Sequence, residues 1–376
     1  METMTSRQRV INAIEHKPVD RMPIDLGVHF STGISAYAYQ NLRAYLGMDT
    51  DRIEMIDCVQ GLARVDEDIV ERFHVDTCLL NPPFEQTHIW NPRDHYRFHV
   101  PTTFCPERQK DGSYKLTFPW GRMVCPARGY FFEGGWPNFY RVDGEAYYDL
   151  FAERARKIYE ETDKFTMMMG FYAFFGGLDF ACDMLLEPEM IQEANEKALA
   201  EQIEKFDVIN RKMGKYINAI EINSDMGMQS GPLCSPASYE ECCFPYLKRF
   251  CRHVHETSDI KIFLHSCGSI EPLLPYVVEA GVDALNPVQI SAAGMDPKVL
   301  KEKYGDKICF WGGGCNTQSV LNLGTVEDVK RNVKELVDIF KPGGGFVFNQ
   351  VHNIMGDIKP ENIVAMLDTA YENSWY

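Results

Sequence analysis

The chain has 376 residues, 45% of them hydrophobic and 24% charged, which is the ordinary composition of a globular protein with a sizeable core. Its formal net charge of -16 and sequence pI of 5.1 argue against a general nucleic-acid-binding protein, because neutralising phosphates requires clustered Lys and Arg. No run approaches the roughly 18 apolar residues of a membrane span, and the N-terminus has no apolar segment typical of an export signal. We therefore expect a cytoplasmic protein.

The first half of the chain predicts a helix, two strands and an insertion. Residues 1–25 form a short amphipathic pattern followed by a loop bounded by prolines, and residues 22–27 and 75–83 have the composition of strands. Residues 84–145 alternate apolar and polar side chains around Asp111 and Gly112, a pattern typical of a β-hairpin. We interpret this segment as an insertion that acts as a lid or a dimer contact.

From about residue 160 onward, short apolar runs alternate with amphipathic segments. The runs read as buried parallel strands at residues 165–175, 216–225, 260–266, 282–289, 307–313 and 344–352. Helix patterns lie between them, and the one at 325–344 has Thr325 as N-cap and Lys341 at its end. Eight alternating units favour a closed barrel, so residues 1–376 are predicted to form one α/β domain. Its fold would be a (β/α)8 TIM barrel with an N-terminal helical extension and a β-hairpin insertion.

Three metal-ligand side chains follow two of these predicted strands. The stretch KIFLHSCGSI places His265 and Cys267 directly after the strand that begins at residue 260, and CFWGGGCNTQ places Cys315 after another. In an extended segment residues i and i+2 point to the same side, and Gly312 to Gly314 let the backbone turn before Cys315. We expect the three side chains to converge at the C-terminal rim of the barrel, where active sites of this fold lie.

One imidazole and two thiolates form a ligand set that suits zinc and leaves a fourth position open, as in a catalytic site. The chain has twelve cysteines and no export signal, so free thiols and metal ligands are expected in place of a disulfide framework. His-x-Cys alone is a weak motif, and a structural role for these residues is the alternative.

Other side chains at predicted strand ends could complete the site. Asp225, His352 and Asn349 are candidate catalytic groups, with Glu221 as a second choice for a fourth ligand or a proton-handling group. Substrate contacts are predicted for two polar residues and for an aromatic wall: Asp25, Gln289, Phe30, Tyr172, Phe174, Phe175, Trp311 and Phe348, with Trp136 and Tyr140 of the insertion. Ordinary core packing is the alternative for every aromatic residue.

Three segments resemble the uroporphyrinogen decarboxylase superfamily. They are residues 223–250, residues 265–321 and residues 343–366, which include the His-Ser-Cys and Gly-Gly-Gly-Cys motifs. The resemblance implies an (α/β)8 barrel. True decarboxylases of the superfamily carry an Arg-rich N-terminal segment that grips the porphyrinogen carboxylates, whereas the corresponding residues 25–42 contain no Arg before Arg43. This departure argues against porphyrinogen decarboxylation.

The other branch of the superfamily contains corrinoid-dependent methyltransferases, which use a His-x-Cys and a distant Cys as zinc ligands. His265, Cys267 and Cys315 match those positions. The resemblance thus implies a zinc enzyme of methyl transfer that works with a corrinoid (cobalamin). We favour transfer from a methylated small molecule to Co(I), because the predicted aromatic wall suits a methoxylated aromatic as donor. The cobalamin signature Asp-x-His-x-x-Gly is absent, so a partner corrinoid protein would supply that cofactor. A homodimer is also compatible with the superfamily.

Three alternatives remain at this stage. The first is transfer in the other direction, from a methylcorrinoid to a thiol such as coenzyme M. The second is a metal-free decarboxylase or lyase in which Asp25, Asp225 and His352 act on a carboxylated substrate. The third is a binding protein that kept the barrel and lost its chemistry.

Overall fold

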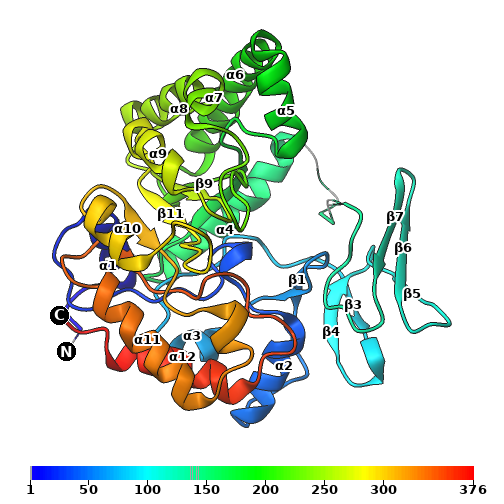
Figure 1. The fold of residues 1–376 in the computed structure, drawn as a ribbon. Coiled ribbons are helices and arrows are strands. Elements are labelled where there is room, and N and C mark those ends of the chain that lie inside the picture. Colours follow the sequence, from blue (N-terminus) through cyan, green and yellow to red (C-terminus); the bar gives the residue numbers. More distant parts are fainter. Residues whose placement is uncertain (1, 136, 138, 141, 143) are drawn as a thin grey trace.

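A computed structural model describes residues 2–135, 137, 139, 140, 142 and 144–376 (Figure 1). At its centre is a parallel sheet of six strands in the order β13, β12, β11, β10, β9, β8. All six correspond to predicted strands, and their bounds are β8 (Met167–Phe171), β9 (Ala219–Asn223), β10 (Lys261–His265), β11 (Ala284–Asn286), β12 (Cys309–Trp311) and β13 (Phe346–Val347).

Two short extended segments close this sheet into a ring. Ile24 forms a parallel bridge with Phe348, immediately after β13. The backbone N–H of Asp76 donates to the carbonyl of Ile24 at 2.7 Å, and Thr77 forms a parallel bridge with Phe165, just before β8. The predicted strands near residues 22–27 and 75–83 therefore lie side by side between β13 and β8. The predicted (β/α)8 barrel is confirmed.

Helices surround the barrel, as Figure 1 shows. The predicted N-cap Thr325 precedes α11 (Val326–Phe340) and accepts a hydrogen bond from the Asp328 N–H. The helices are α2 (Ala36–Tyr45), α3 (Glu67–Arg72), α4 (Glu145–Glu161), α5 (Leu178–Leu186), α6 (Pro188–Met213), α7 (Pro236–Cys242), α8 (Phe244–Thr257), α9 (Leu274–Ala280), α10 (Pro297–Tyr304), α11 (Val326–Phe340) and α12 (Pro360–Glu372). In the described part of the chain, no helix combines the length and apolar character that crossing a membrane requires.

Helix α1 (Ser6–Ile14) packs into one end of the barrel. Its Val10, Ala13 and Ile14 join a buried cluster with inward-facing residues of the strands, among them Phe165 and Trp311. On the other side of α1, buried ion pairs fix the helix to the adjoining chain: Arg9 contacts Asp20 at 2.7 Å and Asp76 at 2.6 Å, and Arg21 contacts Asp76 at 2.7 Å. The predicted N-terminal helical extension thus fills the N-terminal end of the barrel.

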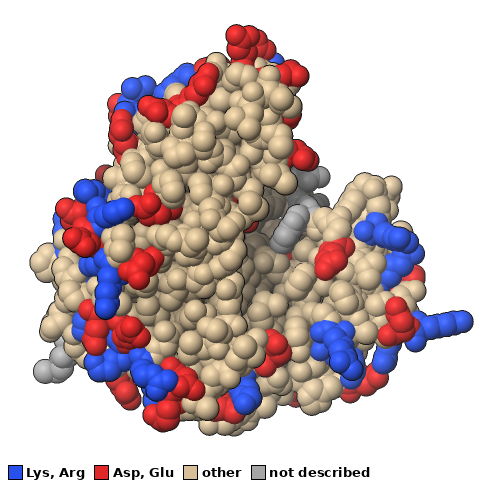
Figure 2. Space-filling view, in the orientation of Figure 1, with Lys and Arg blue, Asp and Glu red and all other residues tan. Residues whose placement is uncertain are grey.

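The insertion forms two small antiparallel sheets beside the barrel (Figure 1). The turn at Asp111 and Gly112 joins β5 and β6 as predicted, and a second hairpin follows. Trp90 holds the two sheets together, since its ring packs against Phe98, Phe104, Tyr114 and Phe132. The strands are β3 (Thr87–Trp90), β4 (Phe98–Pro101), β5 (Glu107–Arg108), β6 (Tyr114–Phe118) and β7 (Gly121–Cys125), with β1 (Met55–Asp57) and β2 (Leu62–Ala63) preceding them. On the face seen in Figure 2, a hollow separates the insertion from the barrel.

Candidate metal centre

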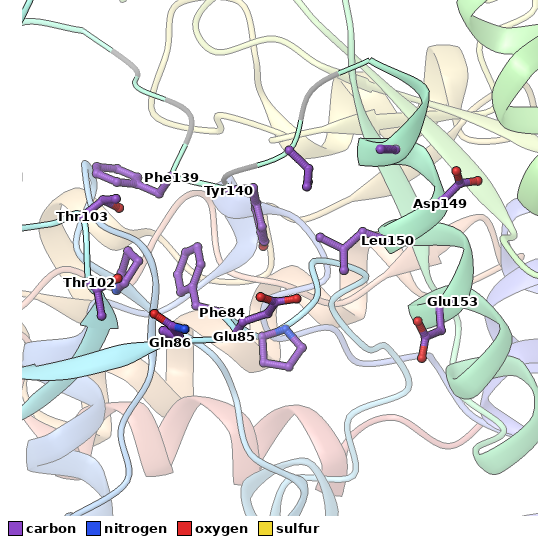
Figure 3. Close-up of a pocket in the computed structure, with 14 residues that line it drawn as sticks. Phe84, Glu85, Gln86, Thr102, Thr103, Phe139, Tyr140, Asp149, Leu150 and Glu153 are labelled. Carbon is purple, nitrogen blue, oxygen red and sulfur yellow. The ribbon is translucent and has the colours of Figure 1, made fainter.

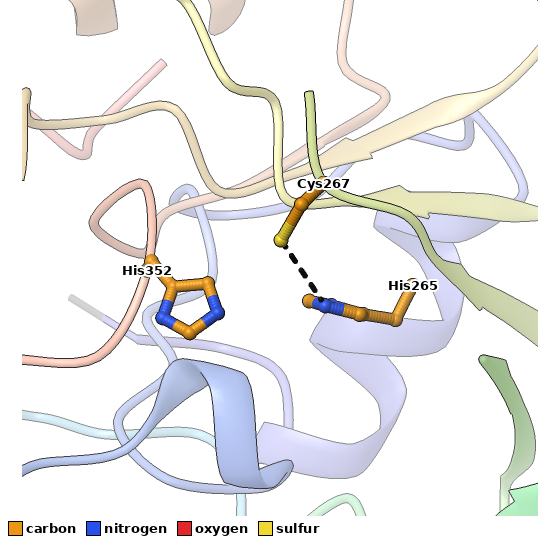
Figure 4. Close-up of side chains that lie close together, drawn as sticks. All are labelled: His265, Cys267 and His352. Atoms are coloured by element: carbon orange, nitrogen blue, oxygen red, sulfur yellow. Dashed lines mark hydrogen bonds between the residues drawn. The ribbon is translucent and has the colours of Figure 1, made fainter. Parts of the chain in front are cut away.

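Three side chains with metal-ligand atoms converge at the C-terminal rim of the barrel. In the described part of the chain, the group with this property is His265, Cys267 and His352, whose ligand atoms all lie within 4.8 Å of one another (Figure 4). The distance between His265 Nε2 and Cys267 Sγ is 3.5 Å. Two zinc ligands at about 2.1 and 2.3 Å in a tetrahedral arrangement would stand about 3.6 Å apart, so these two atoms are already spaced for one ion.

The backbone around Cys267 is held from two sides. His265 is the last residue of β10 and Cys267 follows two residues later. The N–H of Cys267 donates to Asp225 Oδ1 at 2.8 Å, and the N–H of Gly268 donates to Gln289 Oε1 at 2.7 Å. Gln289, predicted to contact substrate, therefore positions the loop that presents the thiol.

The His265 ring is oriented by a buried asparagine. Asn286, the last residue of β11, has its Oδ1 at 2.8 Å from His265 Nδ1, and its Nδ2 donates to the carbonyl of Trp311 at 2.9 Å. The Asn286 Nδ2 group is directed to Trp311, so the Asn286 oxygen is the atom that faces the imidazole. His265 Nδ1 therefore carries the proton, and His265 Nε2 keeps its lone pair. Ser31 adds a hydroxyl that donates to the same oxygen at 2.8 Å.

A second histidine and a buried glutamate lie beneath this contact. His29 Nδ1 accepts from the Ser31 N–H at 3.0 Å, which leaves its Nε2 facing Glu221 Oε1 at 3.2 Å. The other oxygen of Glu221 accepts from the Gly170 N–H at 3.0 Å. The sequence offered only weak signals for these residues: Asn286 lies inside the predicted strand 282–289, and His29 and Ser31 flank the predicted aromatic residue Phe30.

Electrostatics keep both imidazoles of the group neutral. Burial, followed by the nearby His29, lowers the pKa of His265, and burial followed by His265 lowers the pKa of His352 to about 4. Burial and the Asp225 carboxylate raise the pKa of the Cys267 thiol. Neutral imidazoles are metal ligands, and a bound cation would reverse the effect on the thiol by favouring the thiolate. The donor set therefore fits a divalent ion.

Cys315 lies outside this group. Its side chain is fully buried in the large apolar cluster that the barrel shares with its helices, and burial raises the pKa of its thiol to about 12. Its carbonyl accepts from the Val351 N–H at 3.0 Å. The structure thus brings together two of the three sequence-predicted ligands and places His352, predicted as a catalytic group, beside them.

The remaining predicted catalytic residues differ in access. Asp225 follows β9, its side chain is 59% exposed, and its Oδ1 lies 3.8 Å from His265 Nε2. Asn349 is fully buried after β13: its Nδ2 donates to the Asp25 carbonyl at 3.0 Å, and its Oδ1 has no hydrogen-bond partner among the described residues. Asp225 therefore faces the centre, whereas Asn349 supports the barrel wall beneath it.

Most residues predicted to contact substrate are part of the core. Asp25 is fully buried and accepts hydrogen bonds from Thr77 Oγ1 at 2.6 Å and from Trp311 Nε1 at 2.8 Å, while burial raises its pKa. Trp311, Phe174 and Phe348 have no exposed surface, because they fill the barrel or its contacts with the helices.

Two of the predicted aromatic residues keep surface that a ligand could touch. Tyr172 is 40% exposed after β8, and Phe30 is partly exposed in the 3-10 helix Phe30–Thr32, next to Ser31. Trp136 lies outside the described residues. Tyr140 belongs to a separate cavity of about 360 Å³ between the insertion and α4, lined also by Phe84, Phe139 and Leu150 (Figure 3). None of the metal-group residues lines that cavity.

Comparison with known proteins places this barrel in a family. A solved structure named "methyltransferase from Methanosarcina mazei" shares the fold with a TM-score of 0.60 over 98% of this chain and 99% of that chain, at 15% sequence identity. Uroporphyrinogen decarboxylase of Thioalkalivibrio sulfidiphilus is 27% identical over 149 residues, which are 38% of this chain and 39% of that protein. The enzyme of the same name from Geobacter sp. (strain M21) is 27% identical over 205 residues, 53% of this chain and 55% of that protein. The chain therefore spans about two fifths to just over half of the length of these relatives. Residues 179–373, more than half of the chain, match the family Uroporphyrinogen decarboxylase (URO-D), and the chain belongs to that family.

Proposed function

We propose that the protein is a zinc-dependent methyltransferase that moves a methyl group from a methylated small molecule to the Co(I) corrinoid of a partner protein. The observation that supports this proposal most directly is the convergence of His265, Cys267 and His352 at the barrel mouth. Imidazole and thiolate ligands suit zinc, and three protein ligands leave a position for substrate. The name of the Methanosarcina neighbour is consistent with such an activity.

The arginines near the N-terminus give a reason to disfavour a carboxylate-rich substrate. Arg43 forms a two-pronged contact with Asp68, at 2.8 Å on each side, and Arg9 and Arg21 are buried against Asp76. Guanidinium groups engaged by the chain's own carboxylates are not available to grip the acid groups of a porphyrinogen. Decarboxylation of such a substrate is therefore the weaker proposal.

In the proposed reaction the bond between the methyl carbon and its oxygen breaks, and a bond between the methyl carbon and cobalt forms with the electron pair of Co(I). The oxygen keeps the pair of the broken bond and takes a proton. Zinc, when bound, would supply a Lewis acid that makes this oxygen a better leaving group. The proton comes from solvent, and Asp225 is the group of this chain placed to relay it, since its side chain is 59% exposed and its Oδ1 lies 3.8 Å from His265 Nε2. Tyr172 and Phe30 would contact an aromatic methyl ether.

The zinc content of anaerobically purified protein tests this proposal. We expect about one zinc per chain in the wild type and its loss in Cys267→Ala, because the thiolate is the strongest donor of the group. Methyl donors would then be screened with a Co(I) corrinoid protein by following the absorbance change of cobalt methylation. Absence of zinc after reconstitution would reject the metal mechanism in favour of the metal-free lyase, and full zinc with no turnover of any donor would favour a binding protein.

A further inference from the structure

We infer that His352, and not Cys315, is the third protein ligand of the metal centre, which makes it a site of two imidazoles and one thiolate. This inference rests on the proposed function for the presence of a metal and goes beyond it in excluding Cys315 and in fixing the charge of the centre. The assignment also defines which class of substrate the centre can activate.

The loop that presents His352 is held in place on both sides. The Val351 N–H donates to the Cys315 carbonyl at 3.0 Å, and Asn353 accepts from the Gly33 N–H at 3.1 Å. Between these anchors the His352 ring lies 5.9 Å, centroid to centroid, from the His265 ring. The side chain therefore needs no rearrangement of the backbone to share an ion with His265 and Cys267.

The loop that carries Cys315 is fixed in a different way, which keeps its thiol in the apolar core. A Cβ atom at Gly313 would lie 2.8 Å from the Val288 side chain, and one at Gly314 would lie 2.4 Å from the Phe348 ring. The Gly314 N–H also donates to the Asn349 carbonyl at 2.9 Å. Such close packing leaves the loop little room to swing the Cys315 thiol into the barrel mouth.

The ligand set decides the charge of the centre. Zinc with one thiolate and two neutral imidazoles carries a net charge of +1, whereas a second thiolate would neutralise it. A centre with residual positive charge withdraws electrons from a bound oxygen more strongly, and it activates a bound thiol less as a nucleophile. The inferred set therefore fits a methyl ether or methyl alcohol as donor better than a thiol as acceptor.

Cobalt substitution tests the assignment, because each thiolate ligand adds sulfur-to-cobalt charge-transfer absorbance. We would compare Co²⁺ and Zn²⁺ affinity and the cobalt spectrum of the wild type, His352→Gln, Cys315→Ala and Cys267→Ser. The expected result is a spectrum of one thiolate that Cys315→Ala leaves unchanged and Cys267→Ser abolishes. His352→Gln should weaken metal binding by more than about tenfold.

Far-UV circular dichroism and thermal unfolding in the presence of a chelator would verify that each variant folds. Metal binding that depends on Cys315 and is unchanged in His352→Gln would overturn this inference while leaving the proposed function intact. A wild-type protein that binds neither metal would overturn both.

Discussion

Asn286 Oδ1 lies 2.8 Å from His265 Nδ1, and the two residues are the last of the neighbouring strands β11 and β10. The contact joins equivalent positions of a parallel pair, since His265 stands opposite Asn286 in the register. The asparagine therefore sets the tautomer of the histidine from within the sheet, where neither residue can shift independently.

Replacing Asn286 by leucine should weaken zinc binding by about 10- to 100-fold, the usual effect of losing the partner that orients a metal-bound histidine. A chelator competition titration would measure the change. Asn362→Leu is the matched control, because Asn362 is equally buried and donates to the carbonyls of Leu321 and Gly324, remote from the centre. Equal zinc affinity in Asn286→Leu and the wild type would reject the orienting role.

Gly268→Ala should lower the free energy of unfolding, and it should weaken zinc binding because it displaces the neighbouring Cys267. Gly268 has a φ of +89°, and a Cβ there would lie 2.4 Å from the Gly227 carbonyl group. Gly47→Ala separates the two effects, since its φ is +70° and no atom of the described part of the chain lies within 4 Å of the added carbon. In both variants we expect the left-handed conformation to lower the free energy of unfolding by about 1 to 2 kcal/mol. In Gly268→Ala the clash should lower it by about 1 to 3 kcal/mol more. Urea unfolding and zinc titration would measure both changes.

Thr77→Val should lower the free energy of unfolding by about 1 to 3 kcal/mol, because it removes a donor from a buried carboxyl group. Thr77 Oγ1 donates to Asp25 Oδ1 at 2.6 Å, and Asp25 is fully buried. Thr166→Val is the control: Thr166 is also buried, but its hydroxyl has no hydrogen-bond partner among the residues that the structure describes, so the variant should be neutral or slightly more stable. A similar loss of unfolding free energy in both variants would mean that the hydrogen bond from Thr77 to Asp25 does not stabilise the fold.

The ion pair between Asp20 and Arg9 should make stability depend on pH in the acid range. Burial disfavours the charged form of Asp20, but hydrogen bonds from Arg9 and from the Thr3 and Met4 N–H groups outweigh it and hold the pKa well below 3.8. The folded state thus binds the proton more weakly than the unfolded chain, so the stabilisation is complete above pH 3.8 and is lost as the pH falls toward the folded pKa.

Asp20→Asn should therefore be less stable than the wild type by about 1 to 3 kcal/mol at neutral pH. The difference should shrink as the pH is lowered from about 5 to about 3, which urea unfolding at a series of pH values would measure. A difference that stays constant over that range would assign the effect to packing instead of to the charge of Asp20.

The sequence predicted the barrel well because its signals are periodic. Alternation located the six strands of the sheet and the two extended segments that close it, but it overestimated strand lengths: residues 344–352 were predicted, and β13 spans Phe346–Val347. The extra length came partly from Val351, which is apolar and buried beyond the bridge between Phe348 and Ile24. A run of apolar residues indicates burial, and residues can be buried without being hydrogen-bonded to a neighbouring strand, so the run extends beyond the strand itself.

The sequence predicted which candidate ligands lie together only where they are close in the chain, because there the local backbone geometry decides where their side chains point. His265 and Cys267 share a strand end, so their spacing alone places them on one side. For Cys315, the glycines before it allowed several directions, and packing against Val288 and Phe348 decided among them. The Ser31 hydroxyl that donates to Asn286 comes from 255 residues away in the chain, a separation that no local pattern encodes.

The packing of Val10, Ala13 and Ile14 into the N-terminal end of the barrel leaves the opposite rim as the route to His265 and Cys267. For the proposed reaction, the small methyl donor and the large corrinoid protein would then both reach the metal centre through this rim of the barrel. The donor would have to enter before the partner docks, and the demethylated product would leave only after the partner departs. This order of binding and release defines an ordered kinetic scheme. An excess of partner protein would slow turnover, because a docked partner prevents the methyl donor from entering the barrel mouth.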